Sequence, residues 1–240
     1  MCGRYALSKL PAELIEEFEI HTGKTLPALP ADWNIAPTKQ IYVVRHDAQE
    51  NRELTTLSWG LIAPWSKSVS EALKSQSIAI NARTESVDEK PTFRSAFKSR
   101  RCLIPADGYY EWATELGLPV KQPFYISRSD EQPMAFAGIW DRWIAPTGEI
   151  RESAAIITRP AVSPLAHIHH RMPTFLPMDR WDSWMNRSIN ETNEIRNIMN
   201  VAEPASGLQA VPVGKAVNKV VNNGAGLTAP ISLGEPETLF

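Results

Sequence analysis

The sequence has few cysteines, no marked excess of either charge and no long apolar run. Two cysteines among 240 residues allow at most one disulfide, which excludes a small secreted scaffold held together by disulfides. No stretch approaches the roughly 18 consecutive apolar residues that span a bilayer, and no apolar segment of a secretory signal follows the first basic residue. We therefore expect a soluble cytoplasmic protein with no membrane partner.

Several familiar catalytic signatures are also missing. The sequence has no glycine-rich phosphate loop, no zinc-ribbon spacing of cysteines and no serine nucleophile elbow, and we predict no cofactor. Twenty-five lysines and arginines stand against 27 acidic residues, for a formal net charge of −2. Taken as a total, that charge argues against a partner held by bulk electrostatics, nucleic acid included.

The remaining composition, 43% hydrophobic and 22% charged, is typical of a globular protein. Apolar residues at helical spacing predict helices over 11–20, 179–185 and 191–199. Runs of β-branched and aromatic residues predict strands that include 41–44, 57–59, 124–126, 136–140 and 154–158. The 19 prolines favour many short elements. These patterns predict one α+β domain over residues 1–240, a mainly antiparallel, barrel-like sheet with peripheral helices, its core at about 2–225 and a loose tail at 230–240.

The position of Cys2 offers unusual chemistry. Removal of Met1 would leave a 1,2-aminothiol, with an α-amine of pKa ~7.7–8.0 that is partly unprotonated at neutral pH. A thiol with its own amine as base can attack an acyl group. The same pair can condense with an aldehyde, first as a Schiff base and then as a thiazolidine ring. The alternative is that Cys2 is incidental and simply packs at the start of a strand.

Three short clusters hold the other candidates. The segment 80–85 carries Asn81 and Arg83 two residues apart, on one face if the chain is extended, although a turn with solvated charges fits equally well. The segment 107–112 sets Glu111 among aromatic residues, where burial would raise its pKa toward general-acid use, unless the carboxylate pairs with an arginine beside a core tryptophan.

The third cluster, 167–173, contains three histidines. On a strand, His167 and His169 would share a face and could bind zinc, but no further ligand stands at a characteristic spacing. We therefore predict no metal site and favour a histidine acting as a general acid or base.

Taken together, these clusters belong to seven short motifs that occur in a characteristic order. They are Met1–Tyr5 (MCGRY), Trp33–Thr38 (WNIAPT), Trp59–Ile62 (WGLI), Ile80–Glu85 (INARTE), Cys102–Trp112 (CLIPADGYYEW), Lys121–Phe124 (KQPF) and Ile168–Pro173 (IHHRMP). In these motifs the chain resembles the SOS-response-associated peptidase (SRAP) family over about residues 2–225.

The resemblance implies a DNA damage response activity: covalent capture of abasic sites in single-stranded DNA as a thiazolidine DNA–protein crosslink, which shields the site from strand cleavage. It also implies the fold of that family and a basic channel for the strand. We expect a monomer that associates with the nucleoid through DNA binding. By match to the motifs, the catalytic candidates are Cys2, Asn81, Glu111 and His169. The DNA-binding candidates are Arg4, Trp65, Arg83 and Arg171.

The residues support this expectation on chemical grounds. An abasic deoxyribose equilibrates with a ring-opened aldehyde, which is the partner that a 1,2-aminothiol needs, and both ring opening and imine formation require proton transfer. The segment 90–105 holds five basic residues and no acidic one, a composition suited to phosphate contact, although it also fits a solvated surface. Those five are Lys90, Arg94, Lys98, Arg100 and Arg101.

Two other functions fit the same residues. A thiol peptidase would use Cys2 to remove Met1 and then to cleave other peptides, as the family's hydrolase label suggests. A non-catalytic reader would bind modified or single-stranded DNA without forming a covalent bond.

Overall fold

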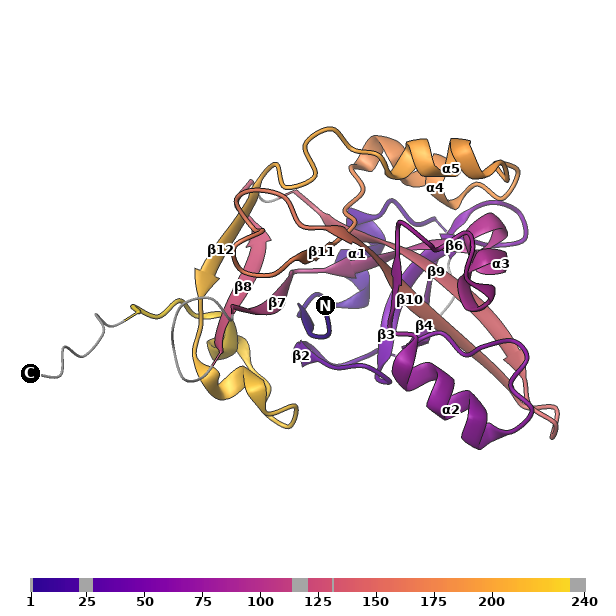
Figure 1. Cartoon of the computed structure of the whole chain (residues 1–240), viewed down its shortest axis with the longest axis horizontal. Helices are drawn as coiled ribbons and strands as arrows, with labels where there is room; N and C mark the ends of the chain where they lie inside the picture. Colours follow the sequence, from indigo (N-terminus) through magenta and orange to yellow (C-terminus); the bar gives the residue numbers. More distant parts are fainter. Residues whose placement is uncertain (1, 22–27, 114–120, 131, 234–240) are drawn as a thin grey trace, which may run out of the picture.

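The computed structural model describes residues 2–21, 28–113, 121–130 and 132–233. It confirms the predicted α+β class, because two β-sheets lie side by side with short helices around them (Figure 1). Within the described residues, no helix has the length and apolar character needed to cross a membrane.

The larger sheet contains a barrel. Five of its strands pair in a closed ring in the order β10–β4–β3–β6–β9 and back to β10, with the β10–β4 pair parallel and the other pairs antiparallel. This ring confirms the predicted barrel-like sheet. Its strands are β3 (Gln40–His46), β4 (Arg52–Trp59), β6 (Arg101–Ala106), β9 (Met134–Ile144) and β10 (Ile150–Pro160).

Two short strands extend the far end of β10. Strand β5 (Asn81–Arg83) pairs with it in parallel, so that Asn81 lies opposite Ile156. Strand β11 (Arg171–Pro173) pairs with it in antiparallel fashion, so that Arg171 lies opposite Pro160. The predicted histidine and INARTE clusters are therefore brought to the two edges of one strand.

The second sheet is antiparallel throughout, in the order β12–β8–β7–β1–β2. Its strands are β1 (Tyr5–Leu7), β2 (Asp32–Ile35), β7 (Gly108–Ala113), β8 (Gln122–Arg128) and β12 (Leu208–Pro212).

Buried aromatic rings join the two sheets. Tyr5 of β1 meets Trp59 of the barrel edge-on, with ring centroids 5.3 Å apart, and meets Phe136 at 5.8 Å. Tyr109 of β7 also packs edge-on against Phe136. Aromatic burial of this kind removes much apolar area from water, and it fixes the first residues of the chain between the two sheets, where Figure 1 shows them in indigo.

The helices agree with the sequence in part. The helix predicted over 11–20 begins at Pro11 as expected, but it ends at Glu17, because Glu19 takes a left-handed φ of 50°. The stretch 179–185 is a 3₁₀ turn followed by one short helix, whereas the helix predicted over 191–199 is confirmed. The helices are α1 (Pro11–Glu17), α2 (Val69–Ile78), α3 (Pro91–Ser99), α4 (Trp181–Met185) and α5 (Thr192–Met199), with 3₁₀ turns η1 (Met178–Arg180), η2 (Lys215–Asn218) and η3 (Ala225–Thr228).

The sequence did not lead us to expect α2 or α3. Helix α2 buries only Ala72 and Gln76 and has little apolar periodicity, although Ser68 caps it by accepting the Glu71 backbone N–H. Helix α3 buries Phe93, Ala96 and Phe97, but Arg94 interrupts this short apolar pattern and Lys98 follows it.

The loose tail predicted at 230–240 is wrong at its start. Pro230 forms a β-bridge with Val213, and the Ile231 N–H donates to the Pro212 carbonyl at 2.9 Å. The chain is therefore still attached to the sheet at the end of β12. The rest of the predicted tail, from 234 to 240, lies outside the described residues, as does Met1.

The basic segment 90–105 is only partly a basic surface. Lys90, Arg94 and Lys98 are exposed, but the Arg100 guanidinium pairs with Asp141 at 3.0 Å and Arg101 is 2% exposed. The Arg101 guanidinium donates to five backbone carbonyls, those of Trp184, Phe97, Lys98, Asn186 and Ile189. Two of the five predicted cations therefore hold the fold together and do not face a ligand.

We expect Arg101→Ala to lower the free energy of unfolding by about 3 kcal/mol or more, because it removes charged hydrogen bonds and leaves buried carbonyls unsatisfied. Urea unfolding followed by circular dichroism measures the change. The matched control is Arg94→Ala on the exposed face of α3, which should stay within about 0.5 kcal/mol of the parent protein. Equal losses in the two variants would contradict a structural role for Arg101.

Candidate active site

Cys2 lies three residues before the start of β1 and is completely buried. Its carbonyl oxygen accepts a hydrogen bond from Asn81 Nδ2 at 2.7 Å, which ties the start of the chain to β5. Burial, reinforced by the negative charge of Glu111, raises the pKa of the Cys2 thiol well above its ordinary value. The sulfur is therefore a thiol at neutral pH, and a nearby base must take its proton before it can attack.

Glu111 is brought to Cys2 by strand pairing. Tyr5 of β1 lies opposite Tyr109 of β7, and the Tyr110 N–H donates to the Arg4 carbonyl at 2.9 Å. Because the pairing is antiparallel, the next residue of β7, Glu111, comes alongside the residues that precede β1. Glu111 is 4% exposed, and this burial raises the pKa of its carboxyl group to about 7.

His169 approaches Glu111 from the loop between β10 and β11. Its Nδ1 lies 3.8 Å from Glu111 Oε1, 3.0 Å from the Arg171 backbone nitrogen and 3.3 Å from the Arg171 carbonyl oxygen. In the shorter of the two Arg171 contacts the backbone N–H donates to Nδ1, which favours the neutral ring with its hydrogen on Nε2. Burial lowers the pKa of His169 to about 4, which keeps the ring neutral at physiological pH.

The four predicted catalytic candidates therefore meet at one place, although they come from four separate segments. Asn81 contacts Cys2 directly, His169 faces Glu111, and the charge of Glu111 acts on the Cys2 thiol. A neutral imidazole, a carboxyl group that titrates near pH 7 and a protonated thiol form a site suited to passing protons between neutral groups.

Two tyrosines complete the surroundings of Cys2 and were not singled out in the sequence. Tyr5 and Tyr109 are both buried, and burial raises the pKa of each phenol well above its ordinary value. The Tyr5 hydroxyl finds no hydrogen-bond partner among the described residues. Both tyrosines lie within quoted motifs, and that is the signal by which they could have been found.

The four predicted DNA-binding residues divide into two pairs. Arg83 is exposed two residues after Asn81 on β5, and Trp65 is 54% exposed between β4 and α2. Arg4 is partly buried, and its Nη1 donates to Asn34 Oδ1 at 2.8 Å and to the Val217 carbonyl at 3.0 Å. Only the first pair presents its side chains openly to a ligand.

Arg171 is the other member of the second pair and is 6% exposed. Its guanidinium forms a two-point ion pair with Glu85 and donates to the Thr158 carbonyl at 2.5 Å. The Arg171 guanidinium in turn lowers the pKa of Glu85 to about 2. Through Arg171, Glu85 and Thr158 therefore hold β11 in place, and the Arg171 backbone N–H in that strand contacts His169. The sequence did not indicate this role.

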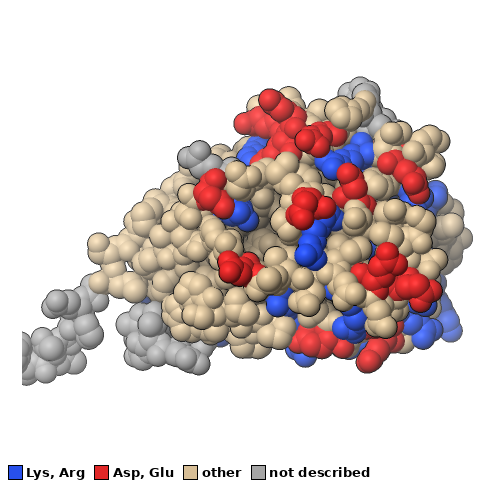
Figure 2. Space-filling view, turned by 90° about the horizontal axis from the view of Figure 1, so that it is seen from above, with Lys and Arg blue, Asp and Glu red and all other residues tan. Residues whose placement is uncertain are grey.

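The charges on the surface are mixed. On the face in Figure 2, acidic and basic side chains alternate over short distances, and a hollow lies near the middle. This face therefore shows no continuous basic surface.

The three histidines of the cluster lie before β11 and not on a strand, so His167 and His169 do not share a strand face. His167 is exposed, whereas His169 turns toward Glu111. No group of three or more His, Cys, Asp or Glu side chains placed to hold a metal ion occurs in the described ranges.

Comparison with known proteins points in one direction. A family model described as SOS response associated peptidase (SRAP) matches residues 1–220. The Bacillus subtilis protein named abasic site processing protein YoqW is 34% identical over 223 residues, which cover 93% of this chain and 96% of that protein. The Escherichia coli protein named abasic site processing protein YedK is 28% identical, over 96% of this chain and 100% of its own.

A solved structure shares the fold. The crystal structure of a Bacteroides thetaiotaomicron protein superimposes with a TM-score of 0.83 and 25% identity, covering 96% of this chain and all of the other.

We expect the stability of the protein to fall as pH rises from about 4 to 8, through the titration of Glu111. The carboxyl group binds its proton more tightly in the folded state, with a pKa of about 7, than in the unfolded chain, with a pKa of about 4.3. The unfolded state therefore ionises first and is favoured, by about 4 kcal/mol once both states are ionised.

Glu111→Gln should remove this pH-dependent loss, and chemical unfolding at a series of pH values measures it. Glu89→Gln, which changes an exposed carboxylate, is the control and should keep the parent profile. A Glu111→Gln profile that falls as steeply as that of the parent would show that Glu111 titrates normally.

Proposed function

The chain belongs to the SOS response associated peptidase family, and we propose that it processes abasic sites in single-stranded DNA by forming a covalent bond to them through Cys2. The observation that carries the proposal is the convergence of Cys2, Glu111 and His169, with Asn81 holding the Cys2 backbone. The DNA-processing names of the relatives support the same substrate.

The reaction needs the α-amine and the thiol of Cys2, and therefore removal of Met1. The amine attacks C1′ of the ring-opened sugar, and loss of water gives a Schiff base. The sulfur then bonds to the same carbon, while the thiol proton passes to the former imine nitrogen. Aldehyde and aminothiol thus yield a thiazolidine and one water, with no change of oxidation state. Because the second bond removes the imine, β-elimination and strand cleavage are suppressed.

The electrostatics of the site suit these proton transfers. Glu111, with a pKa of about 7, exists in both forms at neutral pH, so it can protonate the departing hydroxyl and later accept the thiol proton. His169 stays neutral and offers its Nε2–H as a donor to the sugar oxygen during ring opening. Asn81 keeps Cys2 in place while its amine and sulfur react in turn.

Two exposed residues suit contact with a single strand. Trp65 offers an exposed ring on which an unstacked base can rest, and Arg83 offers a guanidinium to a phosphate beside the abasic sugar. Arg4 and Arg171 stabilise the structure around the site and do not contact the strand directly, since their guanidiniums already bind protein groups.

A thiol peptidase that removes Met1, and that cleaves other peptides, is the alternative. Intact-protein mass spectrometry of the parent and of Glu111→Gln tests self-removal of Met1, because a host aminopeptidase would process both equally.

The decisive experiment mixes the protein with a uracil-containing single strand treated with uracil glycosylase. We expect a covalent shift on a denaturing gel that maps to Cys2 and disappears in Cys2→Ala. Cys102→Ala is the matched control, because Cys102 is also buried but lies in β6 of the barrel. An undiminished crosslink in Cys2→Ala would refute the mechanism, and binding without any covalent product would favour a non-catalytic reader.

The role of Glu111 has a separate kinetic test. Glu111→Gln should slow crosslink formation by about 10²- to 10⁴-fold, the usual contribution of a general acid or base, while affinity for an undamaged strand is retained. Single-turnover gel kinetics and fluorescence anisotropy measure the two quantities. Unchanged crosslinking kinetics would remove Glu111 from the reaction.

A further inference from the structure

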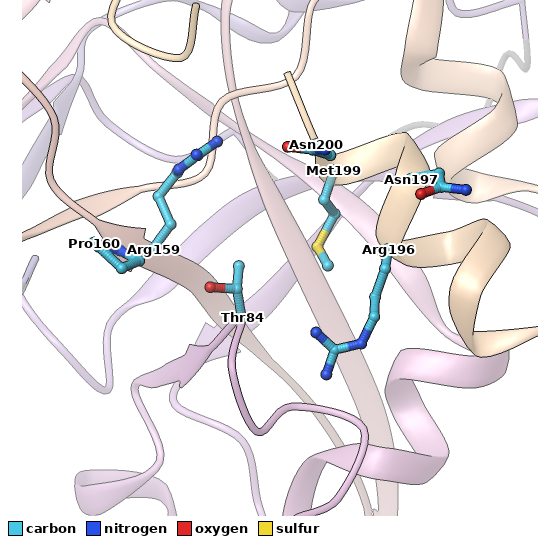
Figure 3. A pocket seen from close by; sticks show the side chains of 7 residues that line it. All are labelled: Thr84, Arg159, Pro160, Arg196, Asn197, Met199 and Asn200. Carbon is cyan, nitrogen blue, oxygen red and sulfur yellow. The ribbon is translucent and has the colours of Figure 1, made fainter. Parts of the chain in front are cut away.

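A second cavity, of about 260 Å³, opens where β5 and β10 end beneath the last turn of α5. Figure 3 shows Arg159 and Pro160 on β10 at one wall and Arg196 on α5 at the other, with the Met199 side chain between them. None of the sequence motifs contains Arg159, and the proposed chemistry does not use it.

Arg159 is the unusual member of this cavity. Its side chain is partly buried, its Nε is buried without a hydrogen-bond partner among the described residues, and burial lowers its pKa. No ion pair to Arg159 occurs in the described part of the chain. A partly desolvated guanidinium without an anion is costly, and a phosphate oxygen is among its strongest partners.

The arginine on the opposite wall, Arg196, has an acidic partner, whereas Arg159 has none among the described residues. The Arg196 guanidinium is held by Asp88, with Nη2 and Oδ1 2.5 Å apart, so its charge is largely compensated. In Figure 3 the two guanidiniums point in different directions, so they do not converge on one atom. Arg159 is therefore the anchoring cation. The Asn197 and Asn200 side chains add polar groups, and Met199 and Pro160 add an apolar surface of a kind that a sugar can contact.

The cavity adjoins the candidate active site. Thr84, which lines it, directly follows Arg83, and the Thr84 N–H donates to the Thr158 carbonyl at 2.9 Å. Arg159 comes three residues after Ile156, the partner of Asn81 in the β5–β10 pair, a span of about 10 Å along a strand, and by strand alternation its side chain lies on the face opposite to that of Asn81. A DNA strand that passes over the end of β10 at Pro160 can therefore reach both the candidate active site and the cavity.

We propose that this cavity binds a backbone phosphate of the DNA strand whose abasic sugar reacts at Cys2, with Arg159 as the phosphate contact. The proposal rests on the proposed function for the identity of the strand. Free phosphate shares the same chemistry, and the experiment separates the two sources.

The test measures reversible binding of an undamaged single strand, which has no aldehyde and so forms no crosslink, by fluorescence anisotropy at several salt concentrations. Each phosphate contact on a single strand contributes about 0.7 to the slope of log K against log salt. We expect Arg159→Gln to make the slope shallower by about 0.7 and to weaken binding about tenfold at low salt. Arg159→Lys, which keeps the charge, should restore most of the slope.

The matched control is Arg142→Gln, which removes the same charge from an exposed position on β9 outside the cavity. It should change the affinity by less than about twofold. An Arg159→Gln slope equal to that of the parent would overturn the proposal, as would an equal loss in Arg142→Gln, because the effect would then be one of total charge. Circular dichroism and thermal unfolding of each variant establish that it is folded.

Inorganic phosphate serves as the second probe. If phosphate raises the melting temperature of the parent but not of Arg159→Gln, and DNA affinity is the same in both, the cavity is a site for free phosphate and the strand contact is refuted.

Crosslinking to a saturating abasic strand distinguishes failure of the phosphate-contact proposal from failure of the capture reaction at Cys2. We expect Arg159→Gln to crosslink at saturation, whereas Cys2→Ala does not. A parent protein that never crosslinks but shows the Arg159-dependent slope would refute the capture chemistry alone.

Discussion

Strand β10 changes its neighbours along its length, and the candidate site depends on that change. Its first half pairs with β9 and β4 and closes the barrel, whereas its last residues pair with β5 on one edge and β11 on the other. The Thr158 carbonyl accepts from both Thr84 and Arg171, so it holds the two short strands at a single point. Asn81 and the loop that carries His169 are positioned by these pairings, and neither β5 nor β11 is long enough to be stable without β10.

Burial sets the protonation of the site more than ion pairing does. Desolvation keeps the Cys2 thiol protonated and His169 neutral, and it brings the pKa of Glu111 to about 7. The reacting groups are therefore close to neutral at physiological pH, which limits the cost of keeping them buried. The aromatic contacts of Tyr5 with Trp59 and Phe136 create this environment, because they seal the junction of the two sheets directly beside Cys2.

The arginines show how little a charge count says about a binding surface. Arg101 is buried among backbone carbonyls, and Arg171 is paired with Glu85, whereas Arg83 is exposed beside Asn81. All of them looked alike as candidate phosphate contacts. Arg159 belongs to none of the sequence motifs, yet it lines a cavity without an anion among the described residues. The partner of each guanidinium is decided by residues far away in the chain.

Local patterns were sufficient for the fold class, for five of the twelve strands among the described residues (β3, β4, β8, β9 and β10), for the start of α1 and for the helix over 192–199, because alternation and helical spacing act within a few residues. The sequence alone also determined that a 1,2-aminothiol becomes available once Met1 is removed, and its motifs pointed to Asn81, Glu111 and His169. Local patterns could not locate the end of α1 at Glu17, foresee α2 and α3, or separate exposed from buried arginines. Only the tertiary structure decided the raised pKa of Glu111, the hydrogen position on His169 and the cavity at Arg159, since desolvation and hydrogen-bond partners arise when distant segments pack together.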